Sequence, residues 1–300
     1  VVLLQTRFND GAHRWRNDGA FTFNDGGSVA GTLNEARQAS LADRDRDGDL
    51  DAAVANFTGY PVQVLANNGS GTFSLATSTG AGENYGVAWG DFNNDGLPDF
   101  AAAKYGNVDD FVARNNGDGT FSTTTLAGTA GNSLAVAWAD ADQDGDLDLA
   151  IANDSGQNEV YVRNNGDSTF STFTLTGTAG NSTALAWGDY DGDGDLDLAV
   201  GNSASDAVLV RNDGGGTFVV VVLFAGFGSG VSGLAWGDAD GDGDPDLLAS
   251  YSNASDAVYL NGGGSFAKVV LPGTGGNSQT PVWADFDGDG DLDVAVTTAS

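Results

Sequence analysis

An acidic loop recurs six times in this chain and constrains both its fold and its ligands. Each copy reads Asp-x-Asp/Asn-x-Asp-Gly-x-x-Asp. The copies begin at Asp43, Asp91, Asp140, Asp189, Asp238 and Asp285. The successive spacings are 48, 49, 49, 49 and 47 residues, which is too regular for chance. A repeat of this kind predicts one structural unit per copy, packed against its neighbours in a single array.

Each loop carries the oxygen groups that calcium prefers. Side chains at positions 1, 3, 5 and 9 and the backbone carbonyl at position 7 can surround one point, while glycine at position 6 allows a sharp turn. We predict six calcium sites, because a set of solvated turns would not repeat four fixed oxygen positions six times. The predicted ligand positions are Asp43, Asp45, Asp47, Asp49 and Asp51; Asp91, Asn93, Asp95, Leu97 and Asp99; Asp140, Asp142, Asp144, Asp146 and Asp148; Asp189, Asp191, Asp193, Asp195 and Asp197; Asp238, Asp240, Asp242, Asp244 and Asp246; and Asp285, Asp287, Asp289, Asp291 and Asp293.

The ions are predicted to be structural, because four side-chain ligands and a carbonyl leave little room for a substrate. Magnesium suits these loops less well, since it retains several of its waters. An EF-hand is excluded because a strand-like run, such as Leu-Asp-Leu-Ala-Val at 196–200, follows the loop directly.

The strongly acidic composition limits which partners the chain can bind and where in or outside the cell it is expected. The chain has 42 acidic and 11 basic residues, a formal charge of −31, and six divalent ions would bring this to −31 + 12 = −19. Nucleic acid and anionic membranes both attract basic surfaces, so neither is an expected partner. The sequence has no cysteine and no apolar run of the ~20 residues that a membrane-spanning helix needs. Weak calcium sites suit the calcium level outside cells, so we expect a secreted or cell-surface protein.

The segments between the loops predict an all-β fold. Residues 133–175 contain four short apolar runs separated by turn residues, with Asn-Gly between the third and fourth. Asn-Gly supplies the positive-φ residues of a tight hairpin, so we expect four antiparallel strands per repeat. Four-stranded antiparallel units repeated in this way are the blades of a β-propeller. We predict a single propeller domain over residues 1–300.

The ends of the chain leave the blade number open. We count six first, six third and six fourth strands but seven second strands, because residues 1–4 and 293–296 both read as one. Six blades fit if the N-terminal and C-terminal strands close the ring together. A seven-blade ring is the alternative.

Two segments carry a resemblance to a known family. They are Trp-Gly-Asp-Tyr-Asp-Gly-Asp-Gly-Asp-Leu-Asp-Leu-Ala-Val at 187–200 and Arg-Asn-Asn-Gly-Asp-Gly-Thr-Phe at 114–121. Over nearly its whole length the chain resembles the FG-GAP/VCBS repeats of integrin-like propellers. The resemblance implies a calcium site between the first and second strands of each blade, and a role in binding or adhesion. The first copy departs from the pattern: Leu41 replaces a tryptophan, and Arg44 and Arg46 flank the carboxylates, so its site is expected to be looser or partly neutralised.

Two sets of residues are candidates for ligand recognition. Tryptophan stands two positions before five of the loops, at Trp89, Trp138, Trp187, Trp236 and Trp283. We expect these rings to pack between sheets rather than to stack on sugars. The loops between second and third strands, and those between blades, are the better recognition candidates because they lie at the opposite ends of the strands from the acidic loops. Residues 56–61 are the most aromatic of them.

The composition offers little for catalysis. One histidine, two lysines, three glutamates and no cysteine leave few general bases or nucleophiles, so we expect no enzyme. The favoured hypothesis is a binding or adhesion module for a glycan or an extracellular protein. A structural subunit that self-assembles through a spare end strand is the alternative, and a glycan-active enzyme is the least favoured reading.

Overall fold

The structure is a computed structural model that describes residues 2–7, 11–17, 23–29, 32, 35–221 and 230–298; side chains are described from residue 29 onward within these ranges. All the regular secondary structure in these ranges is β-strand, as the repeat predicts. No helix long and apolar enough to cross a membrane occurs in this part of the chain.

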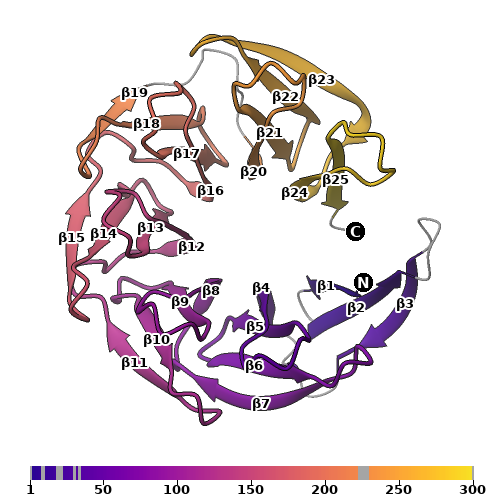
Figure 1. Cartoon of the computed structure of the whole chain (residues 1–300), viewed down its shortest axis with the longest axis vertical. Helices are drawn as coiled ribbons and strands as arrows, with labels where there is room; N and C mark the ends of the chain where they lie inside the picture. The colour runs from indigo at the N-terminus through magenta and orange to yellow at the C-terminus, as the bar shows by residue number, and fades with distance from the viewer. Residues whose placement is uncertain are drawn as a thin grey trace. The chain divides into compact units, whose positions relative to one another are not determined.

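Five of the sheets have four antiparallel strands, and in each of them strands that are consecutive in the chain pair with one another (Figure 1). They consist of β4–β7 (Ala36–Ala42, Asp51–Asn56, Val62–Asn67, Phe73–Thr79), β8–β11 (Asn84–Gly90, Asp99–Lys104, Phe111–Asn115, Phe121–Thr125), β12–β15 (Ser133–Ala139, Asp148–Asn153, Val160–Asn164, Phe170–Thr174), β16–β19 (Ser182–Gly188, Asp197–Asn202, Val208–Asn212, Phe218–Val221) and β20–β23 (Val231–Gly237, Asp246–Tyr251, Ser255–Asn261, Phe266–Gly275). A three-stranded sheet holds β1–β3 (Val2–Arg7, Gly11–Asn17, Phe23–Ser28), and a two-stranded sheet holds β24 and β25 (Ser278–Ala284, Asp293–Thr298).

This arrangement confirms the all-β, propeller-type fold. Each complete sheet is a four-stranded antiparallel meander of one repeat, the blade of a β-propeller. The strand count is also confirmed, since β1 and β25 both stand where a second strand belongs. Val1 lies outside the described residues. The way the two ends of the chain meet stays a prediction.

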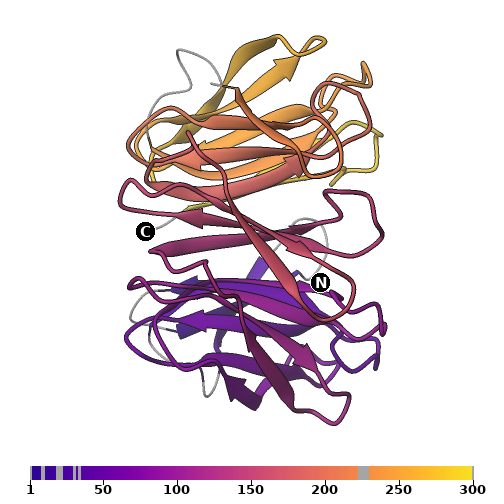
Figure 2. The same ribbon diagram turned by 90° about the vertical axis from the view of Figure 1, so that its left-hand side faces the viewer.

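The chain divides into two compact units. One comprises Val1–Trp138 with Asn164–Thr172, and the other comprises Ala139–Arg163 with Phe173–Ser300. Within each unit, sheets pack face to face (Figure 2). In the first, Ala53 and Val64 pack against Val87 and Phe100 of the next sheet. In the second, Ala199 packs in the same way against Leu234 and its neighbours. Four of the second strands, β5, β13, β17 and β21, are buried at every position.

The tryptophans before the acidic loops join neighbouring sheets. Trp89 donates its indole N–H to the carbonyl of Ser40 at 2.9 Å, one repeat earlier. Equivalent bonds run from Trp138 to Ala88 (3.0 Å), from Trp236 to Ala186 (3.1 Å) and from Trp283 to Ala235 (3.2 Å). Trp187 packs beside Phe218. These contacts confirm the packing role expected for this set.

Candidate calcium centres

The six acidic loops connect the first and second strands of their sheets, where the family resemblance implies calcium sites. Each loop bends around its first carboxylate. The glycine at position 6 donates its backbone N–H to that carboxylate at 2.7–3.1 Å in all six copies. The same glycines have φ between 84° and 99°, a region that other residues rarely adopt. The loop backbone is therefore shaped by the residues that the sequence pattern repeats.

The bend brings carboxylates together. In five loops, three carboxylates offer oxygen atoms that lie within 4.8 Å of one another. The sets are Asp43, Asp45 and Asp47; Asp140, Asp142 and Asp144; Asp189, Asp191 and Asp197; Asp238, Asp240 and Asp246; and Asp285, Asp287 and Asp289. The second loop has Asn93 at position 3, whose Oδ1 accepts the N–H of Asp95 at 2.9 Å. Carboxylates this close repel one another, and a hard divalent cation with oxygen ligands relieves that repulsion.

The carboxylate at position 9 joins the loop to the sheet. Asp51, Asp99, Asp148, Asp197 and Asp246 are each at most 1% exposed. In four of these copies one oxygen accepts the backbone N–H of an asparagine at the end of the third strand, at 2.6–2.8 Å. Burial raises the pKa of Asp99 and of Asp197 to about 7. A bound cation would favour the charged form of these buried groups.

Two of the carboxylates at position 7 accept hydrogen bonds from outside their own loop. Asp244 accepts the N–H of Gly263 at 2.9 Å, in the hairpin between the third and fourth strands. Asp195 accepts the side-chain amide of Gln143 at 2.9 Å. It stays a prediction that position 7 offers a cation its backbone carbonyl, as it must at Leu97.

A set of asparagines that was not among the predicted site residues holds the loops in place. Asn115 donates its side-chain N–H to the carbonyl of Arg44 at 2.9 Å, in the loop of the preceding repeat. The same bond joins Asn164 to Phe92 (2.7 Å), Asn212 to Ala141 (2.6 Å) and Asn261 to Tyr190 (2.6 Å). The asparagines recur every 48 or 49 residues. That period is the signal in the sequence that could have identified them.

At the opposite ends of the strands, much of the polar sequence is structural. Asp110 is fully buried and accepts the backbone N–H of Lys104 at 2.6 Å and the hydroxyl of Ser133 at 3.0 Å. Thr129 is also buried, and its hydroxyl accepts the N–H of Asp110. Thr178 makes the same contact with the N–H of Glu159. Several polar groups of the Gly-Thr-x-Gly-Asn-Ser segments between blades therefore form hydrogen bonds that stabilise the fold.

Asp110 gives a testable pH dependence. Burial raises the pKa of its carboxyl from 3.8 to about 7, so the folded chain holds a proton there that the unfolded chain releases above pH 4. Its contribution to stability is full below pH 4 and is lost as the pH rises to 7, by on the order of 1 kcal/mol per pH unit. Asp110→Asn should abolish this loss. Urea unfolding of both proteins in saturating calcium should show the variant gaining on the parent from pH 5 to pH 8, and parallel curves would contradict the assignment.

Comparison with known proteins identifies the family. Five overlapping segments match the FG-GAP-like repeat: residues 43–102, 91–151, 140–200, 189–249 and 240–296. The chain belongs to this family. No curated protein sequence matches it.

Solved structures share the fold at low sequence identity. A protein from Lactobacillus plantarum superposes with a TM-score of 0.66 and 14% identity, over 90% of this chain and 80% of its own. BBS1N, crystallised in complex with ARL6DN and soaked with lead, gives 0.60 and 11%, over 99% and 83%. The computationally designed Ika8 protein gives 0.62 and 13%, over 94% and 75%. At this identity, the comparison carries the fold alone.

Proposed function

We propose that this chain is a calcium-stabilised β-propeller that acts outside the cell as a binding or adhesion module, with a glycan as its first expected ligand and an extracellular protein as the second. The acidic loops serve stability in this proposal, and the ligand binds at the other end of the strands. No catalytic activity is assigned to the chain, since its sequence is poor in general bases and nucleophiles.

One observation carries the proposal: an aromatic cluster at the ends of the first two complete sheets. The cluster consists of Arg37, Phe57, Tyr85 and Tyr105, all partly buried. The rings of Phe57 and Tyr85 meet edge to face at 5.0 Å, and those of Tyr85 and Tyr105 lie 5.1 Å apart. The Arg37 guanidinium lies 4.7 Å from the ring centre of Phe57 and 4.8 Å from that of Tyr85. These contacts hold the aromatic rings in fixed positions before a ligand binds.

The cluster is a local departure from the repeat. The position of Tyr85, second in its strand, is occupied in the next three repeats by Leu134, Thr183 and Ser232. The position of Phe57 and Tyr105, directly after the second strand, is occupied there by Asp154, Ser203 and Ser252. The fold therefore forms without aromatic residues at these positions. Rings at a surface where packing does not require them indicate recognition.

The chemistry of the cluster suits a neutral sugar. Aromatic faces stack on the C–H face of a pyranose, and tyrosine hydroxyls and guanidinium N–H groups donate hydrogen bonds to sugar oxygens. Tyr60, three residues after Phe57, is a further aromatic side chain in this loop and is 43% exposed. The net charge of −31 opposes an anionic ligand.

The test is a screen of immobilised neutral glycans in millimolar calcium, followed by calorimetry on the best ligand. Tyr85→Ala should weaken binding at least tenfold, about 1.4 kcal/mol. Phe173→Ala, which removes an aromatic side chain 47% exposed outside the cluster, should leave the affinity unchanged. Equal affinity in the parent and Tyr85→Ala, or no glycan bound at all, would contradict the glycan assignment.

The structural alternative has its own observation. In the described part of the chain β25 pairs only with β24, which leaves an edge that another strand could join. An open cavity of about 380 Å³ lies along it, lined by Leu271, Val294 and Val296 among others. Light scattering in calcium distinguishes the readings: concentration-dependent oligomers would favour assembly, and a monomer at all concentrations would exclude it.

A further inference from the structure

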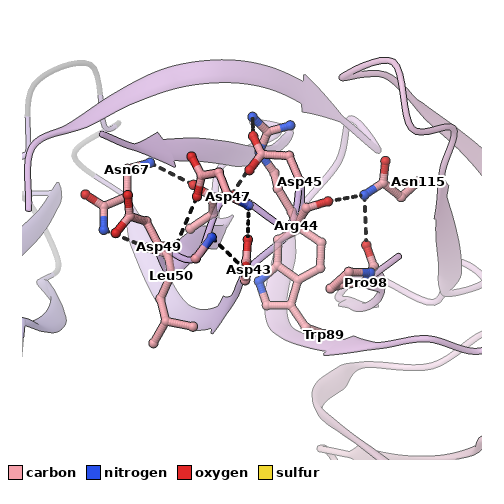
Figure 3. Close-up of polar contacts among 12 residues, drawn as sticks. Asp43, Arg44, Asp45, Asp47, Asp49, Leu50, Asn67, Trp89, Pro98 and Asn115 are labelled. Atoms are coloured by element: carbon pink, nitrogen blue, oxygen red, sulfur yellow. Dashed lines mark hydrogen bonds and ion pairs between the residues drawn. The ribbon is translucent and has the colours of Figure 1, made fainter. Parts of the chain in front are cut away.

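The first acidic loop differs from the others because it contains a buried cation of its own. Arg44 stands at position 2 of this loop, and its side chain is only 10% exposed. Its Nε lies 3.3 Å from Oδ2 of Asp51, which is 1% exposed, and its Nη2 lies 3.1 Å from Oδ2 of Asp45. Figure 3 shows Arg44 beside Asp45, with the carboxylates of Asp43 and Asp47 in the same loop. The guanidinium thus pairs with two of the predicted ligands, at positions 3 and 9.

The other loops have no such group. Their position 2 is uncharged, being Phe92, Ala141, Tyr190, Ala239 and Phe286 in turn. In loops three to six the second oxygen of the position-9 carboxylate accepts the backbone N–H of position 2, at 2.7–3.2 Å. In the first loop Asp51 has, besides a backbone contact with Arg44, an ion pair between its Oδ2 and the Arg44 side chain.

The second arginine of this loop does not play the same part. Arg46 donates from Nε to the carbonyl of Gly96 at 3.0 Å and from Nη2 to that of Asp95 at 3.4 Å, both in the second loop. It links two loops through carbonyl groups. The Arg46 guanidinium therefore lies against the second loop and does not pair with the predicted calcium ligands of the first.

We propose that Arg44 is the resident cation of the first loop, which keeps its structure without calcium while loops two to six bind the ion. For calcium to use Asp45 and Asp51, the guanidinium must leave a nearly buried position and lose two carboxylate partners, which is costly. The backbone of Arg44 is also held in place, because its carbonyl accepts a hydrogen bond from the side-chain amide of Asn115. We expect calcium to bind this loop at least a hundredfold more weakly than the others. The inference does not depend on the ligand proposed above.

The test counts bound calcium by calorimetry and native mass spectrometry. The parent should bind five ions, and Arg44→Ala, which installs the residue found at position 2 of loops three and five, should bind six. Arg46→Gly, which installs the residue at position 4 of loops four to six, should still bind five. Six ions in the parent, no gain in Arg44→Ala, or an equal gain in Arg46→Gly would overturn the proposal.

A second measurement covers the case in which Arg44→Ala does not fold. Arg44→Tyr, matching Tyr190 of the fourth loop, offers another neutral side chain. Hydrogen exchange of the parent in EGTA gives an independent answer. The amides of Asp47 and Gly48, which donate to Asp43 at 3.0 Å, should stay protected while their counterparts in loops three to six exchange. Equal exchange in all loops would overturn the proposal.

Discussion

Excess EGTA should lower the unfolding temperature of this protein by tens of degrees, or leave no cooperative transition at all. Of the five loops expected to bind calcium, loops three to six each gather three carboxylates within 4.8 Å, in a chain of formal charge −31. Calcium at a hundredfold above its Kd stabilises the folded state by about 2.7 kcal/mol per site. Five such sites contribute about 13 kcal/mol, which is as large as the whole stability of an ordinary domain.

Differential scanning calorimetry in EGTA and in millimolar calcium measures this effect. Magnesium at the same concentration should restore only part of the stability, because it keeps its waters and fits such loops poorly. Sodium chloride at matched ionic strength separates ion binding from simple screening of charge. The same transition temperature in EGTA and in calcium would show that the loops are stable as turns without an ion.

The second large effect is expected from Gly188→Val. A Cβ built on Gly188 would lie 2.6 Å from the indole ring of Trp236, which packs over it from the next repeat. The ring cannot easily move, because its N–H is bonded to Ala186 at 3.1 Å. Valine adds two methyl groups beyond the Cβ, so we expect a loss of about 3 kcal/mol or more in the free energy of unfolding.

Gly275→Val is the matched control for this substitution. Gly275 also lies in a strand, and a Cβ there would meet no atom within 4 Å. Urea unfolding in saturating calcium should place the control within about 0.5 kcal/mol of the parent. If Gly188→Val were equally stable, the contact between tryptophan and glycine would not hold neighbouring sheets together.

The strands and loops were predictable from the sequence because their signals are local. Alternating apolar runs, Asn-Gly turns and the acidic pattern gave the strand count, including the duplicated second strand. The tryptophans could be assigned to packing because their position in the repeat is fixed.

The contacts between repeats were not predictable in the same way. The bond from Asn115 to Arg44 spans 71 residues, and nothing in the local sequence names its acceptor. Arg44 and Arg46 looked equivalent in the sequence, yet one pairs with carboxylates of its own loop and the other bonds to carbonyls of the next. The aromatic cluster likewise forms from four residues on two sheets, of which the sequence pattern singles out only Phe57, in the 56–61 segment.

The most direct test of the account is a crystal structure grown in calcium, with anomalous data collected to locate the ions. The account predicts one calcium peak in each of loops two to six, about 2.3–2.6 Å from oxygen atoms at positions 1, 3, 5, 7 and 9. The first loop should contain the Arg44 guanidinium and no peak. If no loop contained calcium, the central claim that these loops are calcium sites would be wrong.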